Sequence, residues 1–246
     1  YSLMITKLLL LLIFSILFSD SEYLTKEQKY FGGWPKFQGE TNNLPNAIID
    51  CPGETGCSCI DDTSCINNNC IKMPRGKYCT PQVGDKFPNF TALDQYGEEV
   101  SIYDFSNNGK YILLEMGATW CTPCRELADW FSYNNEAIFK QRWFKEEYTI
   151  INEMIHEDQL YYITILYEDS NKDNVTYDTL YDWFLEYPDE KIPVLADSEK
   201  FLHSWIKPTG LPTILLLNEK MEIVVFTNRG VNAAFDKILE LVKNEK

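Results

Sequence analysis

Hydrophobic and polar positions divide the chain into three stretches of different character. Residues 8–18 form a largely apolar run. Residues 20–79 are mostly polar and carry many Gly, Pro, Asn and Asp residues, which break any periodicity. From Val83 onward, short apolar runs with strand-like and helix-like spacing follow one another. The pattern predicts one substantial domain at 80–246, preceded by less regular segments.

Strands and helices alternate within residues 80–246. The predicted strands are 90–93, 100–105, 111–116, 161–167, 213–217 and 222–227, and the predicted helices are 121–131, 136–155, 179–187 and 233–242. The first two strands flank a turn at 94–97, which predicts a hairpin. The compact apolar run 111–116 is typical of a buried central strand. The alternation predicts an α/β sandwich with a mixed sheet.

The N-terminal stretch has the features of a targeting segment. Lys7 precedes the apolar run, and Ser19, Asp20 and Ser21 follow it, as in a secretory signal peptide at 1–21. A run of eleven residues is short for a membrane span, although an uncleaved anchor stays open as an alternative. The sequence therefore predicts an extracytoplasmic protein, periplasmic or secreted, with residues 22–50 as a linker.

The composition excludes one class of partner. The chain has 246 residues with a formal net charge of -15. Nucleic acid needs clustered Lys and Arg, so it is not an expected partner. A membrane is an expected partner only if residues 1–21 stay uncleaved.

Six cysteines lie within residues 51–79, a segment with few apolar residues. They are Cys51, Cys57, Cys59, Cys65, Cys70 and Cys79. Behind a signal peptide, this density predicts a small module held by three structural disulfides, whose pairing the spacing leaves open. Two alternatives stay open: metal binding by the cluster, and exchange of one bridge with Cys121.

The remaining two cysteines form the motif Trp120-Cys121-Thr122-Pro123-Cys124, where a buried strand ends and a helix begins. A helix N-terminus stabilises a thiolate, so Cys121 is the expected attacking thiolate and Cys124 the resolving thiol. A zinc site would need a second CxxC or a pair of histidines at suitable spacing, which the sequence lacks. No metal is therefore expected here, and a static disulfide is the weaker interpretation.

The motifs resemble a known family. Residues 83–246 resemble the extracytoplasmic TlpA-type branch of the thioredoxin superfamily, which is related to the redoxin and AhpC/TSA group. The resemblance is carried by 83–90, 118–126 and the run Gly210-Leu211-Pro212-Thr213. It implies a thioredoxin-like three-layer sandwich with a mixed central sheet, an N-terminal hairpin and a central insertion, here preceded by the cysteine-rich module.

The resemblance also implies roles for individual residues. Pro212 corresponds to the family's cis-proline, and Leu211 would present its backbone to an extended substrate. Trp120, Thr122 and Pro123 would border the substrate-binding edge. Glu115 occupies the position of a buried acid that takes a proton from the resolving cysteine, Cys124.

These features predict an exported thiol–disulfide oxidoreductase without a cofactor. The Thr122–Pro123 pair lacks the His of strong oxidants, which favours reduction of protein disulfides. Its partners would be disulfide-containing proteins and an unidentified thiol electron donor. The frame before Cys121 lacks the peroxiredoxin pattern, so peroxidase activity is not expected. The alternative is a secreted or surface binding protein that uses the fold as a scaffold.

Overall fold

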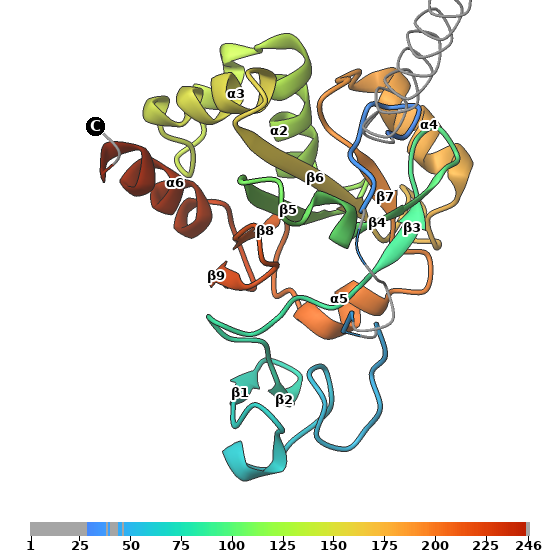
Figure 1. The fold of residues 1–246 in the computed structure, drawn as a ribbon, viewed down its shortest axis with the longest axis vertical. Coiled ribbons are helices and arrows are strands. Elements are labelled where there is room, and N and C mark those ends of the chain that lie inside the picture. The colour runs from blue at the N-terminus through green and yellow to red at the C-terminus, as the bar shows by residue number, and fades with distance from the viewer. Residues whose placement is uncertain (1–28, 38, 40–43, 46, 245–246) are drawn as a thin grey trace, which may run out of the picture.

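The computed structural model describes residues 29–37, 39, 44–45 and 47–244, so the expected signal peptide at 1–21 lies outside the described residues. Its centre is a five-stranded sheet with the strand order β7-β6-β5-β8-β9 (Figure 1). The strands are β5 (Tyr111–Gly117), β6 (Leu160–Leu166), β7 (Val194–Ala196), β8 (Thr213–Leu217) and β9 (Ile223–Val225). The first three are parallel, and β8 and β9 are each antiparallel to the strand before them in space. The predicted mixed sheet is therefore confirmed.

Helices cover both faces of this sheet. They are α2 (Thr122–Tyr133), α3 (Thr149–His156), α4 (Tyr177–Glu186), α5 (Phe201–Ile206) and α6 (Asn232–Asn244). Successive side chains of β5 point to opposite faces, as the pleat of a strand requires. Leu113 belongs to a core with α2, α3 and α6, whereas Leu114 belongs to a second core with α4 and α5. Two cores around one sheet make the three-layer sandwich that the sequence predicted.

The order of these elements is that of the thioredoxin fold. The succession β5-α2-β6-α5-β8-β9-α6 forms its minimal unit, and α4 and β7 form a central insertion between β6 and α5. A hairpin of β3 (Thr91–Leu93) and β4 (Glu99–Ser101) precedes the unit. This confirms the predicted fold class, including the hairpin and the insertion. Among the described residues, no helix is long and apolar enough to cross a membrane.

The second predicted strand, 100–105, is wrong from Ile102 onward. β4 ends at Ser101, and Ile102–Phe105 form a 3-10 turn. The Ser101 hydroxyl accepts a hydrogen bond from the N–H of Tyr103, and the Asp104 carboxylate accepts one from the N–H of Ser101. This reciprocal capping turns the chain before the strand can continue.

The predicted single helix at 136–155 is also wrong. The segment contains two 3-10 turns, Glu136–Lys140 and Glu146–Tyr148, and only then the helix α3. On one continuous helix Ile138 would point roughly 110° away from the side that carries Phe144, Tyr148 and Ile151. All four side chains are buried in one core, so the chain must break between them.

Residues 29–37 pack against the hairpin, although the sequence analysis placed them in a linker. Trp34 is buried and donates its indole N–H to Asp94 at 2.9 Å, and Tyr30 donates its hydroxyl to Asp104 at 2.8 Å. Burial of the Trp34 ring attaches this segment to the thioredoxin-like domain.

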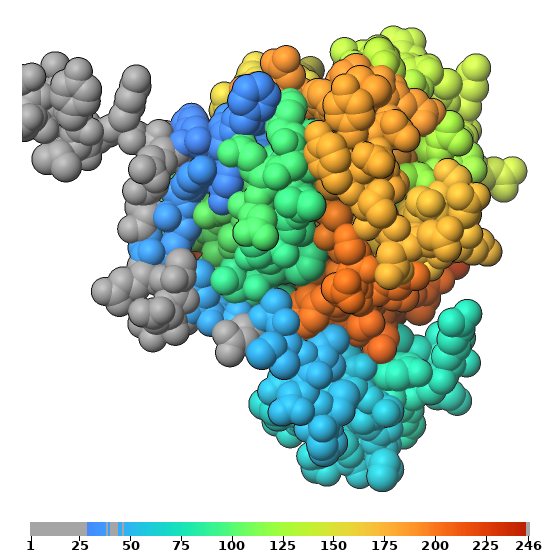
Figure 2. Space-filling model, turned by 90° about the vertical axis from the view of Figure 1, so that its right-hand side faces the viewer, coloured from blue at the N-terminus to red at the C-terminus, as the bar shows by residue number. Residues whose placement is uncertain are grey.

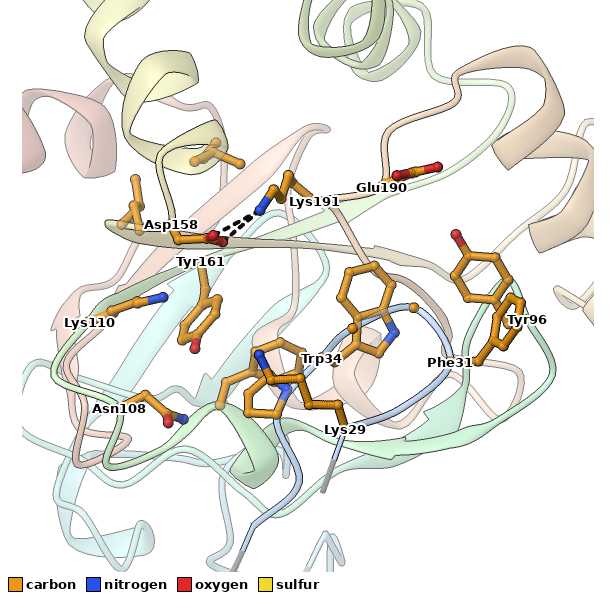
Figure 3. A pocket seen from close by; sticks show the side chains of 16 residues that line it. Lys29, Phe31, Trp34, Tyr96, Asn108, Lys110, Asp158, Tyr161, Glu190 and Lys191 are labelled. Atoms are coloured by element: carbon orange, nitrogen blue, oxygen red, sulfur yellow. Dashed lines mark hydrogen bonds and ion pairs between the residues drawn. The ribbon is translucent and has the colours of Figure 1, made fainter. Parts of the chain in front are cut away.

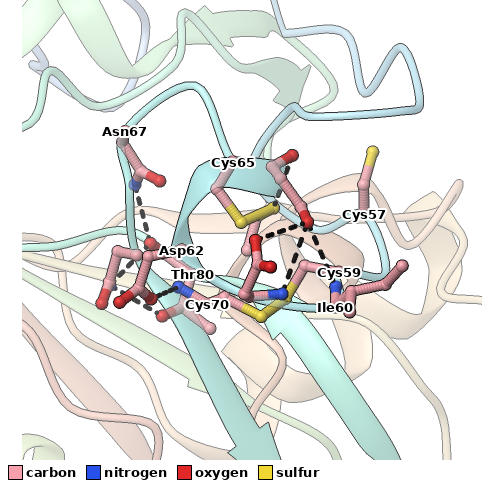
Figure 4. Close-up of a disulfide and its surroundings, with 12 residues drawn as sticks. Cys57, Cys59, Ile60, Asp62, Cys65, Asn67, Cys70 and Thr80 are labelled. Carbon is pink, nitrogen blue, oxygen red and sulfur yellow. Dashed lines mark hydrogen bonds between the residues drawn. A yellow bond between two sulfur atoms is a disulfide. The ribbon is translucent and has the colours of Figure 1, made fainter.

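The cysteine-rich segment forms a small module around a second hairpin, β1 (Cys70–Met73) and β2 (Gly76–Cys79). Its disulfides are Cys51–Cys57, Cys59–Cys70 and Cys65–Cys79. The N–H of Cys70 also donates to Asp62, and the Asn67 amide donates to the Thr80 carbonyl (Figure 4). The module projects from one end of the molecule (Figure 2). With so few buried apolar side chains, cross-links hold it together.

Candidate functional site

The Cys121–Cys124 disulfide lies at the start of α2. Cys121 is the N-cap residue, and its Sγ accepts a hydrogen bond from the N–H of Cys124 at 3.2 Å. Thr122 and Pro123 open the helix, where the first N–H groups have no partner within the helix and a proline fits. Thr122 is exposed and Pro123 half-buried, whereas both cysteines are buried. The helix N-terminus therefore faces Cys121 with unpaired N–H groups that favour negative charge on its sulfur.

Glu115 lies two residues before the end of β5, on the face of the strand that α2 covers. Its Oε2 accepts hydrogen bonds from the Tyr162 hydroxyl at 3.0 Å and from the Thr164 hydroxyl at 3.2 Å. Its Oε1 is buried and has no hydrogen-bond partner among the described residues. Oε1 and the Sγ of Cys124 each lie 3.5 Å from the position that a Cβ on Gly117 would occupy. The free oxygen thus lies on the side of Gly117 that Cys124 occupies.

Burial changes the proton affinity of this acid. Desolvation raises the pKa of Glu115 from 4.5 to about 7, against the opposing effect of the Tyr162 and Thr164 hydrogen bonds. A carboxyl group with such a pKa can take up or release a proton near neutral pH.

The loop before β8 borders the disulfide. The Leu211–Pro212 peptide bond is cis, and the pairing of Thr213 with Met116 places this bond beside the end of β5. The carbonyl of Pro212 accepts a hydrogen bond from the N–H of Gly230 at 2.7 Å. Among the described residues, the N–H and C=O of Leu211 make no backbone hydrogen bond. The backbone of Leu211 is thus available to pair with an extended chain.

Trp120 precedes the disulfide and is 41% exposed. Its indole N–H donates to Oε2 of Glu168 at 3.0 Å, and Oε1 of Glu168 accepts from Lys200 at 2.8 Å. Burial acts to raise the pKa of Glu168, but the hydrogen bonds from Lys200 and Trp120 outweigh it and hold the pKa below its usual value. The ionised Glu168 fixes the orientation of the Trp120 ring.

The structure brings together Cys121, Cys124, Glu115, Trp120 and the Leu211–Pro212 loop at one edge of the sheet. Sequence reasoning missed Glu168 and Lys200, which lie far from Trp120 along the chain. One signal could have found Glu168: it follows a strand parallel to β5, and parallel strands end at the same edge of a sheet.

The six module cysteines are bonded only to one another, and none is bonded to Cys121 or Cys124. The sulfurs of Cys59, Cys65 and Cys70 lie within 4.8 Å of one another. All three are disulfide-bonded, and a metal would need them as thiolates.

A cavity lies at the other end of the strands. It has a volume of about 760 Å³ and is lined by residues of the 29–35 segment, by Lys110 just before β5 and by Tyr161 at the start of β6 (Figure 3). An ion pair of Lys191 with Asp158 crosses its rim. Cys121 follows the opposite end of β5, so this cavity takes no part in the disulfide site.

Comparison with known proteins supports the predicted resemblance. Residues 83–142 match the model of the AhpC/TSA family, and this segment contains the β3–β4 hairpin, β5 and α2 with both motif cysteines. The module at 51–79 lies outside the match. A search of curated proteins found no match.

Several solved structures are similar to the chain. A thioredoxin-like protein from Bacteroides caccae shares 19% identity and a TM-score of 0.47, over 68% of this chain and 51% of the other, so the match spans about half of that protein. A putative thiol:disulfide interchange protein DsbE from Chlorobium tepidum shares 16% identity and a TM-score of 0.48, over 67% and 98%. The pneumococcal exposed lipoprotein thioredoxin from Streptococcus pneumoniae shares 20% identity and a TM-score of 0.44, over 63% and 98%.

Likenesses at these scores carry no argument about substrate, location or direction of reaction. The fold, the family match and the site geometry together support one general class, the thioredoxin-like thiol–disulfide oxidoreductases.

Proposed function

We propose that the protein is an exported thiol–disulfide oxidoreductase that reduces protein disulfides through Cys121 and Cys124. This proposal rests on one observation: a CxxC disulfide caps α2, and a buried acid has its free oxygen on the same side of Gly117 as the Cys124 sulfur. A scaffold without redox function has no need of this arrangement.

The reaction begins with the reduced protein. The Cys121 thiolate attacks one sulfur of a substrate disulfide, the substrate S–S bond breaks, and a mixed disulfide forms while one substrate thiolate leaves. Leu211 holds the substrate backbone by strand-like hydrogen bonds, and Trp120 covers the exposed side of the mixed disulfide.

Cys124 then resolves the mixed disulfide. Glu115 accepts the thiol proton of Cys124, the resulting thiolate attacks the Sγ of Cys121, and the second substrate thiolate leaves. Two electrons pass to the substrate, and the protein is left with the Cys121–Cys124 disulfide that the structure contains. A thiol donor must return those two electrons before the next cycle.

Two features support export and the direction of the reaction. Three disulfides in a small module are typical of proteins outside the reducing cytosol. Neither residue between the cysteines is a His, so fewer donors stabilise the Cys121 thiolate than in strong oxidants.

The direct test is the reduction potential of Cys121–Cys124 in the chain from residue 22 onward, together with trapping by Cys124→Ser. A potential near -270 mV, about that of thioredoxin, with substrates captured on Cys124→Ser but not on the matched Cys121→Ser variant, is the expected result. A potential near -120 mV, about that of a strong oxidant, would reverse the proposed direction. A Cys121–Cys124 pair that does not exchange with any thiol would refute the proposed enzymatic function.

A further inference from the structure

Two positive side chains lie on or against the loop at 207–212, on which the substrate backbone is proposed to lie, although the protein has a net charge of -15. Lys207 ends α5, four residues before Leu211. On the other side of that loop, the Arg229 side chain lies against Gly210, with its Nε 2.8 Å from the position a Cβ there would take. Arg229 thus lies against the residue before Leu211, and Lys207 stands at the start of the same loop.

The cysteine-rich module adds a third cation. The Tyr78 ring lies under the Lys207 ammonium at 4.7 Å, and the Tyr78 hydroxyl donates to the carbonyl of Arg75 at 3.2 Å. Gly56 also approaches the backbone of Ser204 in α5, because a Cβ there would lie 2.8 Å from the Ser204 oxygen. These contacts place the tip of the β1–β2 hairpin, where Arg75 is exposed, next to α5.

His203 in α5 reports the local balance of charge. Burial lowers the pKa of its ring; Glu168 acts in the opposite direction, and Lys200, Lys207 and Arg75 add to the lowering. Glu168 already bonds Lys200 and Trp120. Among the described residues, no carboxylate lies within 4.0 Å of a nitrogen of Arg75, Lys207 or Arg229.

The pKa of Lys207 reflects its lack of an acidic partner. Burial lowers the pKa of Lys207, because its ammonium loses water and gains no carboxylate in exchange. An incoming carboxylate would supply that missing partner, so an anion is the ligand that this surface favours.

We propose that Arg75, Lys207 and Arg229 form a cationic rim that binds acidic side chains next to the disulfide of an extended substrate segment lying along Leu211. The inference rests on the proposed function and names its substrate class. In a protein of net negative charge, a local positive edge attracts an acidic segment toward the disulfide. The module is then part of the substrate site, because it supplies Arg75.

The test uses two peptides of equal length with the same internal disulfide, flanked by Glu in one and by Lys in the other. We expect the mature protein to reduce the acidic peptide with a kcat/KM about tenfold higher at low salt. The preference should shrink at about 1 M NaCl, where the screening length falls to about 3 Å. Reversing the rim with Arg75→Glu, Lys207→Glu and Arg229→Glu should invert the preference.

The matched control is Lys243→Glu on α6, which packs on the opposite face of the sheet. This variant should keep the acidic preference. The inference is overturned if the mature protein treats both peptides alike, or if reversal of the rim leaves the ratio as it was.

A binding measurement separates this inference from the proposed function. The Cys121→Ser/Cys124→Ser protein cannot exchange disulfides, yet it keeps the rim, so we expect it to bind the labelled acidic peptide at least several-fold more tightly than the basic one. If no peptide is reduced by the mature protein but this difference in affinity persists, the enzyme proposal fails and the rim stands. Equal affinities refute the rim whatever the redox result.

Discussion

The free carboxylate oxygen of Glu115 and the sulfur of Cys124 lie on the same side of Gly117, each in contact distance of the space that its missing side chain leaves open. In the proposed reaction, this relationship makes Glu115 the acceptor of the Cys124 thiol proton during resolution of a mixed disulfide.

Replacement of the acid should slow resolution. Glu115→Gln keeps an oxygen for Tyr162 and Thr164 but cannot accept a proton, so we expect resolution at pH 7 to slow by roughly 100-fold. In the unaltered protein the rate should rise with an inflection near pH 7, following the pKa of about 7, and the variant should lack that inflection. Release of thiol from a preformed mixed disulfide measures the rate. Glu153→Gln, an exposed change on α3, serves as the control, and an unchanged profile in Glu115→Gln would remove Glu115 from the mechanism.

Stability should also depend on Glu115. Its pKa is raised in the folded protein from 4.5 to about 7, so the folded state holds this proton more tightly than the unfolded state. This contribution to the free energy of unfolding is fully present below about pH 4.5 and is lost as pH rises to about 7. The loss is on the order of 3 kcal/mol.

Glu115→Gln should therefore be more stable than the unaltered protein at pH 8, and the difference should vanish near pH 4. Denaturant titrations at both pH values measure it. A variant less stable than the unaltered protein at pH 8 would show that burial of the ionised Glu115 does not destabilise the folded state.

The orientation of Trp120 should affect substrate binding. Glu168→Ala removes the acceptor of the indole N–H and the partner of Lys200. We expect KM for a peptide disulfide to rise several-fold with little change in kcat, because Glu168 acts on binding through Trp120 and not on the reacting sulfurs. Glu168→Gln retains an acceptor oxygen and should restore much of the KM. Trp120 fluorescence should shift in the Ala variant, and an equal loss of kcat in both would contradict this role.

The disulfide that closes the longest loop of the module should stabilise the module without affecting the reactive Cys121–Cys124 pair. Cys65–Cys79 closes a loop with a sequence separation of 14, so its loss costs roughly 3 kcal/mol in the chain-entropy account. The paired change Cys65→Ala/Cys79→Ala should speed hydrogen exchange at 51–79 and weaken the preference for acidic peptides. The potential of Cys121–Cys124 should stay the same. A large shift in that potential would indicate redox exchange between the module and Cys121.

Features set by nearby residues could be predicted from the sequence. The buried run of β5, the turn at Cys121 and the strand after Pro212 each depend on neighbours a few positions away. The alternation of strands and helices predicted the mixed sheet, and the resemblance to a known fold supplied the three-layer arrangement and the central insertion. The pairing of the six module cysteines did not follow, because the spacing permits many alternatives and the structure supplies the choice.

Contacts between distant segments could not be predicted. The short strand β7 and the six-residue helix α5 carry little periodic signal, and they form because they pack on the second core. The spacing of apolar residues suggested one continuous helix at 136–155, but Ile138 reaches the core only because the chain breaks between it and α3. The contact of Lys207 with Tyr78 joins residues from two different domains of the predicted organisation, and no local pattern indicates it.

The pairing within the module has a consequence for the order of events during synthesis. Each of its disulfides joins cysteines separated by 6, 11 or 14 positions, and all six precede Cys121. In the proposed export, the N-terminal part of the chain reaches the oxidising compartment first, so the module's cysteines can pair with one another before Cys121 and Cys124 arrive. The six structural thiols are then already in disulfides when the reactive thiolate, which could otherwise form wrong bridges with them, appears.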